Sequence, residues 1–481
     1  MREQREAPRS TLKEIARSIF EHALADCSID RSLNRIVSIA TDAGNTRLIL
    51  DGHDIVALNR LKRVRIVSAG KAAAAMLTSL LSRLPLPSSC DLQGVLIASE
   101  RPQGLNTAIQ YFRGGHPVPN DASFAGAAAA LSMLRELRDA SRDDTLCVFL
   151  ISGGASAMME LPLDFAISLE DTIAFHRSLV HCGASIVEIN CVRKHFSAIK
   201  GGRLGLAAGL ANKVSLLVSD VPPAHLDALA SGPTIPDPTT VAQCREILAH
   251  YKLLEQFPQS VRLFFRSHNL PETPKPGELI SPSWKLLDSD ELARTAQFHA
   301  AQMGFHTIID NTCDDWNYAE AADYLLGRLR QLRREYPKVC LISAGEVTVQ
   351  VPHTFSNRSP CSATNDQATY VGGRNQHFAL YLARQLRLED GTLAVLSAGS
   401  DGIDGNSDAA GAIVDEHTLD GDDPYNSAAH SASTQPRTRR ASAEQALQAF
   451  DSSTWLRAVG ATFITGPTGH NLRDLRILLA M

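Results

Sequence analysis

The sequence predicts an α/β protein made of two α/β domains, with mainly parallel sheets covered by helices. Short β-branched runs recur along the chain, and each is followed by a Gly, Ser or Asp turn and then by an Ala- and Leu-rich helical pattern. This alternation is typical of parallel strands joined by helices. The 481 residues are 44% hydrophobic and 21% charged, which suits two or three domains with full cores.

Six apolar runs are the predicted strands. They cover residues 64–67, 95–98, 146–151, 214–218, 339–342 and 393–396, and a helix is expected at 72–81. Parallel sheets bind ligands beyond the carboxyl ends of their strands. The turns that follow these runs are therefore the places to look for functional side chains.

The predicted domain boundary lies in a proline-rich stretch, because residues 256–282 contain five prolines and show weak periodicity. We expect a Rossmann- or flavodoxin-like domain at 1–255, a linker or crossing segment at 256–291 and a second α/β domain at 292–481.

Composition excludes several classes of function. The net charge is −5 with acids and bases interspersed, and aromatic residues make up 6%, so we expect no nucleic-acid partner. No stretch approaches the roughly 20 apolar residues of a membrane span, so no membrane partner is expected. Nine cysteines without a CxxC pair and a charged N-terminus favour a cytoplasmic protein. Either a monomer or a homodimer is compatible with these data.

Two turns of the first domain have the chemistry of phosphate sites. Lys71 follows a strand and a glycine at the start of a helix, where backbone amides and a lysine attract anions. The turn at Ser152, Gly153, Gly154 and Ser156 combines close backbone approach with hydroxyl donors. A solvated lysine and an ordinary packing turn remain the alternatives.

A basic segment and an acidic strand end follow in the same domain. Arg193 and Lys194 belong to a cluster of five bases between residues 190 and 203, which favours an anionic substrate. Asp220 ends the strand at 214–218 and could bind a metal or accept a hydroxyl proton, or cap the next element.

The second domain contains the other candidates. A loop with three glycines and three aspartates follows the strand at 393–396, and its Asp401 and Asp404 could hold Mg²⁺ together with a phosphate. Glu346 ends another strand. The glycines and polar side chains of Gly372, Gly373, Arg374 and Asn375 open an apolar helix and could form a phosphate site.

Taken together, the motifs resemble the class II glycerate kinase family, whose C-terminal module is called MOFRL. The matching pieces are GKAxxxM at 70–76, GGHPVP at 114–119, SGGxSA at 152–157, VRKHxSAIKGGRL at 192–204, SDVP at 219–222, SGPTxPDPTT at 231–240, GGRNQ at 372–376, SDGIDGxxDAAGA at 400–412 and GPTGxNxxDLRILL at 466–479. They run in the family's order from about residue 12 to the end of the sequence. The chain departs from the usual pattern at Val347, His377 and His470.

The resemblance implies an active site in the cleft between the domains and transfer of phosphate from ATP, with Mg²⁺, to D-glycerate. The 2-hydroxyl is the expected acceptor, giving 2-phosphoglycerate. Lys71 and Arg374 are then the candidate catalytic residues. The glycerate-binding candidates are Arg193, Lys194, Ser156 and Asp220. The nucleotide or phosphate candidates are Ser152, Gly153, Gly154, Gly372, Gly373 and Asn375. The metal candidates are Glu346, Asp401 and Asp404.

Three alternatives remain open at this stage. The first is an NAD(P)H-dependent hydroxypyruvate reductase, although the turn at Lys71 lacks the GxGxxG spacing of a dinucleotide site. The second is a kinase that forms 3-phosphoglycerate. The third is a sugar-phosphate or nucleotide sensor without catalytic activity.

Overall fold

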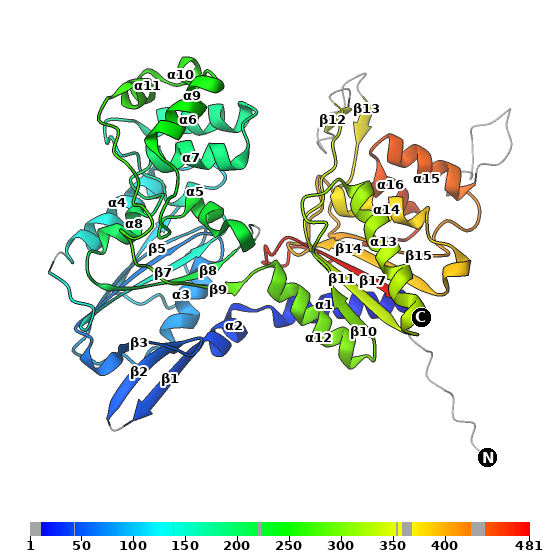
Figure 1. Cartoon of the computed structure of the whole chain (residues 1–481), viewed down its shortest axis with the longest axis horizontal. Coiled ribbons are helices and arrows are strands. Elements are labelled where there is room, and N and C mark those ends of the chain that lie inside the picture. The colour runs from blue at the N-terminus through cyan, green and yellow to red at the C-terminus, as the bar shows by residue number, and fades with distance from the viewer. Residues whose placement is uncertain are drawn as a thin grey trace. The chain divides into compact units, whose positions relative to one another are not determined.

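The computed structural model describes residues 11–42, 44–137, 139–219, 221, 223–352, 355–357, 368–424 and 438–481. Its contacts divide the chain into two compact units, one of Ile29–Leu287 and one of Met1–Ser28 with Asp288–Met481. Both units are α/β, as the sequence predicts (Figure 1). Among the described helices, none combines the length and apolar composition that a membrane span requires.

A six-stranded sheet with the order β6-β5-β4-β7-β8-β9 forms the centre of the Ile29–Leu287 unit. Its strands are β4 (Arg63–Ala69), β5 (Asp91–Ala98), β6 (Ile109–Arg113), β7 (Thr145–Ser152), β8 (Asn212–Val218) and β9 (Ser283–Leu287). Every pairing in this sheet is parallel, which confirms the prediction for this unit. All eight residues of β7 are buried, because helices cover both faces of a parallel sheet.

Helices pack on this sheet from opposite sides (Figure 1). The helix α3 (Ala73–Leu81) contacts β4, β5 and β7, whereas α4 (Asp121–Arg135) contacts β5 and β6. Shorter elements are α2 (Ile29–Ile36), α5 (Ala155–Met158), α8 (Arg203–Ala207) and the 3-10 helices Leu58–Arg60 and Pro223–Ser231. An antiparallel sheet of β1 (Val37–Asp42), β2 (Asn45–Leu50) and β3 (His53–Ala57) completes this part.

Five further helices of this unit form a separate layer. They are α6 (Leu169–His181), α7 (Ile186–Phe196), α9 (Val241–His250), α10 (Leu253–Gln256) and α11 (Gln259–Arg266). Phe175 and Phe196 stack at 4.1 Å in the core of this layer, and Phe257 and Phe265 pack around them. The layer positions α7, which carries the basic segment of the sequence.

The other unit has a sheet with the order β10-β11-β17-β14-β15-β16. Its strands are β10 (His306–Ile309), β11 (Val339–Gly345), β14 (Leu393–Gly399), β15 (Gly411–Asp415), β16 (Thr462–Phe463) and β17 (Asp474–Ala480). Only the β10–β11 pairing is parallel here. This sheet departs from the mainly parallel expectation because the C-terminal strand β17 inserts between β11 and β14 and runs opposite to both, and because β15 runs opposite to β14 and β16.

Helices cover both faces of this second sheet as well. The helix α1 (Leu12–Asp26) contacts β14, β15 and β17, and α12 (Ser289–Gln302) contacts β10, β11 and β17. The helices α13 (Tyr318–Glu335) and α14 (Arg374–Ala383) share a hydrophobic core with the sheet, in which α13 contacts β11 and β17 and α14 contacts β14 and β15. The remaining elements are α15 (Arg439–Gln448), α16 (Ser452–Ala458), the 3-10 helix Leu388–Asp390, and the parallel pair β12 (Phe355–Asn357) and β13 (Ala368–Tyr370).

The two units differ from the predicted boundaries of 1–255, 256–291 and 292–481. The helix α1 belongs with the C-terminal residues, because Ala16, Phe20 and Ala23 on its buried face meet the second sheet. Most of the segment predicted as a linker or crossing, residues 256–287, is part of the Ile29–Leu287 unit, where it forms α11 and the edge strand β9, and residues 288–291 begin the other unit. Prolines interrupt the periodicity there, and this hid elements that are packed by non-local contacts.

Candidate active site

The Lys71 turn and the Ser152–Gly154 turn lie side by side at the carboxyl ends of β4 and β7, as predicted. The backbone nitrogen of Lys71 donates to the Gly153 carbonyl at 2.9 Å, and the nitrogen of Ala72 donates to Ser152 Oγ at 3.0 Å. Gly70 has φ of 117°, and a Cβ atom there would lie 2.3 Å from Ser152 Oγ. Only glycine allows this approach, which leaves the Lys71 side chain exposed beside the turn.

A cavity of about 510 Å³ opens next to this turn, and it is lined by both Ser156 and Arg193. Gly154, at the start of α5, lines it too; a Cβ there would lie 3.0 Å from a ring carbon of His116 and 3.3 Å from Cγ of Lys71. The stem of Lys71 therefore lies close to the cavity wall. The structure thus brings together predicted residues from three separate motifs.

Arg193 is a half-buried cation on this cavity. Its Nε atom is buried without a hydrogen-bond partner, and among the described side chains no carboxylate pairs with it. Burial lowers the pKa of its guanidinium, and the nearby Glu160 charge opposes that shift. A buried guanidinium without a partner is costly, so a carboxylate ligand in the cavity would stabilise it.

The buried ion pair of Lys200 and Glu160 lies behind Ser156, which lines the same cavity. Lys200 donates to the Ser156 carbonyl at 2.9 Å and contacts the carboxylate of Glu160. Glu160 also accepts from Ser197 Oγ at 2.6 Å and bonds His176 Nε2 at 2.9 Å. Burial alone would raise the pKa of Glu160, but Lys200 and His176 outweigh it and hold the pKa below its usual range.

Sequence reasoning missed Glu160 and His176. The signal for Glu160 was present, since it is a lone acid in the apolar run at 158–163. Such a residue is almost never fully buried unless it is paired. His176 had no comparable signal, because it is one of several polar residues on α6.

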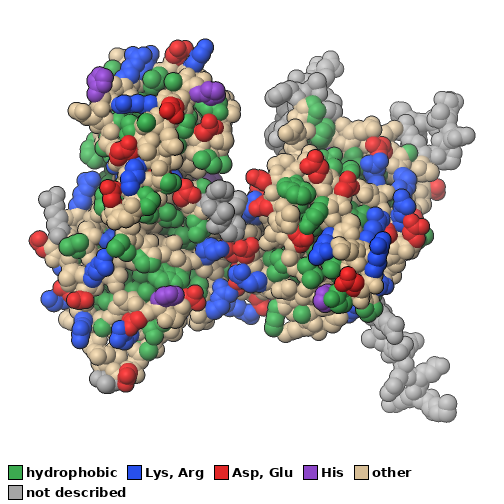
Figure 2. Space-filling model, viewed as in Figure 1, with side chains coloured by type: hydrophobic (Ala, Val, Ile, Leu, Met, Phe, Trp, Pro, Cys, Tyr) green, Lys and Arg blue, Asp and Glu red, His purple; other side chains and the backbone are tan. Residues whose placement is uncertain are grey.

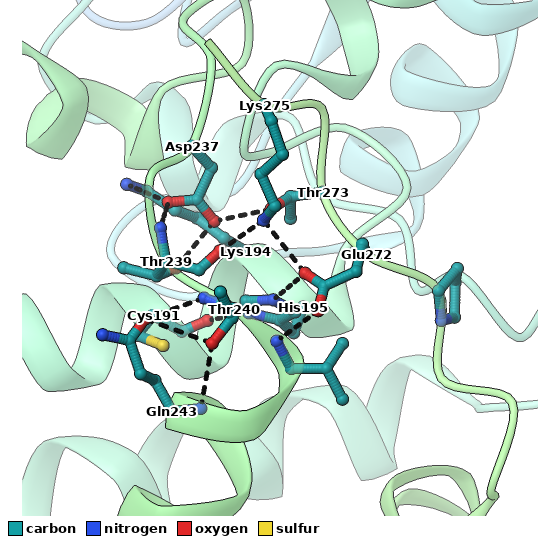
Figure 3. Close-up of polar contacts among 12 residues, drawn as sticks. Cys191, Lys194, His195, Asp237, Thr239, Thr240, Gln243, Glu272, Thr273 and Lys275 are labelled. Atoms are coloured by element: carbon teal, nitrogen blue, oxygen red, sulfur yellow. Dashed lines mark hydrogen bonds and ion pairs between the residues drawn. The ribbon is translucent and has the colours of Figure 1, made fainter. Parts of the chain in front are cut away.

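Lys194 is not among the residues that line this cavity, and its side chain belongs to a cluster of polar contacts around Asp237 (Figure 3). Its Nζ atom donates to Asp227 at 2.8 Å and to the fully buried Asp237 at 3.3 Å. Thr239 and Thr273 also donate to the Asp237 carboxylate. Lys194 is thus neutralised inside the protein, and its predicted contact with substrate remains a prediction that the geometry does not favour.

The second unit contains a cavity of about 590 Å³ at the start of α14, lined by Glu346, Arg374, Asp401 and Asp404. The predicted residues of the C-terminal half therefore converge. The cavity walls also include Gly372, Gly373, His377, Phe450 and the valines at 347, 349 and 351.

Arg374 is held by two carboxylates on this cavity. Its Nε and Nη2 atoms donate to Asp474 at 2.6 and 3.1 Å, and Nη1 donates to Glu346 at 2.9 Å. Burial would lower the pKa of the guanidinium, but these two acids more than offset it and raise the pKa. Burial also raises the pKa of Glu346, and Arg374 opposes that shift. Arg374 is therefore a permanently charged and fixed group.

Asp314 and Arg473 extend this network, and sequence reasoning missed them together with Asp474. The two Arg473 Nη atoms donate to the Asp314 carboxylate at 2.6 and 2.8 Å, and the Glu346 nitrogen donates to Asp314 at 2.9 Å. Arg473 and Asp474 stand at the start of β17, whereas Asp314 lies in the loop between β10 and α13. The sheet order β10-β11-β17 brings these segments together, and no local pattern predicts it.

Asp404 caps the helix that carries Arg374. Its carboxylate accepts from the backbone nitrogens of Asn375 at 3.0 Å and Gln376 at 2.8 Å, and its side chain is 2% exposed. Burial raises the pKa of Asp404 to about 7, although the backbone donors act in the opposite direction. A Cβ on Gly373 would lie 2.2 Å from the carboxylate. Glycine is required there for this contact.

The other predicted residues of this helix start also make internal contacts. Ser397 Oγ donates to the Asn375 side chain at 2.6 Å, and the Gly372 nitrogen donates to Asn406 Oδ1 at 2.8 Å. The amides of Asn375 and Gln376 are committed to Asp404. Anion binding at this helix start would therefore depend on Arg374 more than on backbone amides.

Within the described ranges, no three His, Cys, Asp or Glu side chains are placed to hold a metal ion together. Of the three predicted metal ligands, Glu346 is paired with Arg374 and Asp404 caps α14, whereas Asp401 lines the cavity with Oδ1 accepting from the Ile403 nitrogen at 3.0 Å. Mg²⁺ commonly takes one or two carboxylates and completes its shell with phosphate and water. Asp401 fits that role best. Asp220 lies outside the described residues.

Two family models match the chain: "Domain of unknown function (DUF4147)" over residues 15–266 and "MOFRL family" over 339–474. A "D-glycerate 2-kinase" of Thermotoga maritima is 33% identical, with 87% of this chain and 90% of the relative covered. A "Glycerate 2-kinase" of Pyrococcus horikoshii is 30% identical, with 97% of each covered. A "Putative hydroxypyruvate reductase" of Agrobacterium vitis is 34% identical, with 87% of each covered.

Two solved structures have the same fold. A protein of Pyrococcus horikoshii OT3 matches with a TM-score of 0.77 and 28% identity, covering 99% of this chain and 100% of that one. A glycerate kinase of Thermotoga maritima matches with a TM-score of 0.73 and 29% identity, covering 98% and 99%. The fold defines a two-domain α/β protein with one cavity lined by charged side chains in each unit. The chain belongs to the class II glycerate kinase family, with a MOFRL domain at its C-terminus.

Proposed function

We propose that this chain is a glycerate kinase, which transfers the terminal phosphoryl group of ATP to D-glycerate. The observation that carries the proposal is Arg374, a cation fixed by Asp474 and Glu346 on the wall of a 590 Å³ cavity. Phosphoryl transfer depends on positioning and on cations aimed at the transferring group. The names of the Thermotoga and Pyrococcus relatives support the same reaction.

Arg193 is the proposed contact for the glycerate carboxylate. Arg193 lines the 510 Å³ cavity together with Ser156, and its buried Nε atom has no hydrogen-bond partner among the described residues. A guanidinium binds a carboxylate through two parallel hydrogen bonds. Lys194 has an indirect role in this proposal: it anchors α7, the helix that carries Arg193, to Asp237.

Lys71 and Arg374 are the proposed catalytic cations. Lys71 is exposed at the end of β4, where its backbone is fixed by the Gly153 carbonyl. A lysine in such a turn can reach the phosphates of a nucleotide as a flexible point charge. The glycines of the Ser152–Gly154 turn allow the ligand to approach the backbone closely.

Mg²⁺ is the proposed metal, with Asp401 as its protein ligand. Its chemistry would be to neutralise charge on the phosphates. Glu346 is the second candidate ligand for Mg²⁺. Binding the metal would weaken the hydrogen bond that Glu346 accepts from Arg374. Asp404 instead keeps α14 in place through its backbone hydrogen bonds.

Phosphorus NMR of a reaction with ATP, Mg²⁺ and D-glycerate tests this function directly. We expect ADP and 2-phosphoglycerate in equal amounts. A 3-phosphoglycerate signal would keep the kinase and change the acceptor hydroxyl. Absence of any glycerate-dependent ADP formation by folded protein would reject the kinase and favour a sensor on the same fold.

A hydroxypyruvate reductase is the second candidate, because two Agrobacterium vitis relatives carry that name. Mixing the protein with hydroxypyruvate and NADH or NADPH distinguishes the two activities. A kinase should cause no loss of nicotinamide absorbance. Turnover comparable to the kinase rate would reject the assignment made above.

A further inference from the structure

His377 is a buried imidazole on the wall of the 590 Å³ cavity, and the reaction proposed above leaves it without a role. It lies three residues after Arg374 on α14, so both side chains project from the same face of the helix. The two residues therefore face one cavity from adjacent turns.

Two aromatic rings fix the orientation of this imidazole. Phe450 stacks on it with ring centroids 5.3 Å apart and 7° between the planes, and Tyr318 meets it edge-on at 4.5 Å. Phe450 lines the same cavity. The imidazole is thus held by one stacked ring and one edge-on ring beside the cavity.

The polar atoms of His377 have no partner in the part of the chain that the structure describes. Its Nε2 atom is buried without a hydrogen bond, and no ion pair involves the ring. Burial lowers the pKa of His377 to about 4, so the ring is neutral near pH 7. A neutral imidazole has one donor and one acceptor, and a buried polar atom without a partner is unfavourable.

The cavity has the size and the mixed chemistry that a nucleotide requires. Its 590 Å³ falls within the range of volumes of sites for drug-sized molecules. Val347, Val349 and Val351, which follow β11, line it and give it an apolar side. Arg374 and Asp401 supply charged groups for phosphates and a cation.

We infer that His377 is the specificity contact for the base of the nucleoside triphosphate, through a hydrogen bond to the polar edge of the base. The stacked ring of Phe450 fixes the imidazole for this contact, and the valines cover the apolar part of the nucleoside. This inference rests on the proposed kinase function, because it names the part of the nucleotide that enters the second unit's cavity.

Two substitutions at this position separate hydrogen bonding from packing. His377→Phe keeps an aromatic ring against Phe450 and removes both polar atoms, whereas His377→Gln keeps a donor and an acceptor. We expect His377→Phe to raise the KM for ATP and the Kd for ADP about 5- to 10-fold, with kcat and the KM for glycerate little changed. His377→Gln should stay within about 3-fold of the wild type.

His306→Phe is the matched control. His306 also stacks on an aromatic ring in the same unit, with Tyr336 at 3.5 Å and 6°, but it does not line the cavity. Its substitution should leave the Kd for ADP unchanged. Inorganic tripolyphosphate, which has no base, should bind wild type and His377→Phe equally.

The possible results distinguish failure of the proposed base contact of His377 from failure of the proposed kinase function. If wild type forms ADP with glycerate and His377→Phe has the wild-type KM for ATP, the base contact is wrong and the kinase stands. Equal weakening of ADP and tripolyphosphate by His377→Phe would also overturn the inference, because it would indicate a disturbed cavity. If wild type forms no ADP with glycerate, the proposed kinase function is rejected, and the base contact is rejected with it. Circular dichroism and thermal melts check that each variant is folded.

Discussion

Arg374 on the first turn of α14 makes a two-point contact with Asp474, the first residue of β17. The contact joins residues 100 positions apart and fixes a side chain that would otherwise have many rotamers. Asp474 is 2% exposed, so it is buried behind the arginine rather than presented to a ligand. In the proposed mechanism Arg374 is the catalytic cation, and this geometry makes Asp474 the residue that positions it.

Arg374→Ala should lower kcat about 10²- to 10³-fold, since it removes a fixed charge from the transferring phosphoryl group. Arg374→Lys should recover little, because an ammonium cannot reproduce the two-point contact. Rates of ADP formation at saturating ATP and glycerate measure both effects. Arg387→Ala is the control, because Arg387 pairs with the exposed Glu389 on the surface. Wild-type kcat in Arg374→Ala would remove Arg374 from the mechanism.

Asp474→Asn should lower kcat with a smaller change in the KM for either substrate, because it loosens Arg374 without removing its charge. Adding Asp474→Asn to Arg374→Ala should cost little further activity if the two residues act as one unit. Steady-state kinetics of the single and double variants test this. Additive losses in the double variant would contradict a positioning role.

Lys71→Ala should also lower kcat by two or more orders of magnitude while the protein stays folded, because the exposed side chain makes no contribution to the core. Lys62→Ala is a matched control at the opposite end of the same strand, where Lys62 is 77% exposed and pairs with Asp144. Only the Lys71 variant should lose activity. Equal activity of the two variants would make Lys71 a solvated residue.

Much of the fold and of the site is readable from the sequence. The apolar runs ending in small residues correctly predicted β4 and β7 and the turns after them, which contain Lys71 and Ser152. The parallel pairing of β4 with β7 places these two turns at the same edge of the sheet. The antiparallel insertion of β17 was not predictable, since strand order depends on contacts between distant segments. Asp474 and Asp314 escaped notice for the same reason.

The neighbours Arg193 and Lys194 show a second limit of sequence reasoning. Both were predicted to bind substrate, because a cluster of bases does not reveal which side chain turns inward. The structure places Arg193 on a cavity and Lys194 against Asp237. Their adjacency on α7 gives them different faces of the helix, and the buried acid that pairs with Lys194 comes from a loop 43 residues away.

Arg193→Ala should therefore affect substrate binding, whereas Lys194→Met should affect the stability of the fold. Arg193→Ala should raise the KM for glycerate about 10- to 100-fold, through loss of a charged hydrogen-bonding group, with little change in stability. Lys194→Met should lower the free energy of unfolding by about 3–5 kcal/mol, because it leaves the buried Asp237 carboxylate without its cation. Urea unfolding and steady-state kinetics measure the two quantities. A stable Lys194→Met protein with a raised KM would reverse the assignment.

Asp404 predicts a pH dependence of stability. Its pKa is about 7 in the folded protein because of burial, against about 3.9 for an unfolded aspartate. Between these two values the folded state binds the extra proton, so the free energy of unfolding should fall as pH rises from 4 to 7. One proton gives a slope of at most about 1.4 kcal/mol per pH unit. The stabilisation is complete below pH 4 and lost above pH 7.

Asp404→Asn isolates this contribution, because asparagine cannot titrate and its amide oxygen can still accept from one backbone nitrogen of α14. Urea unfolding at pH 5, 6, 7 and 8 should show a smaller loss of stability with rising pH in the variant than in the wild type. Asp408→Asn, at an exposed position in the same loop that pairs with Arg457, is the control and should keep the wild-type slope. Parallel curves for wild type and Asp404→Asn would mean that the carboxyl is already ionised at pH 5. In that case the backbone amides of Asn375 and Gln376 would stabilise its charge more strongly than burial opposes it.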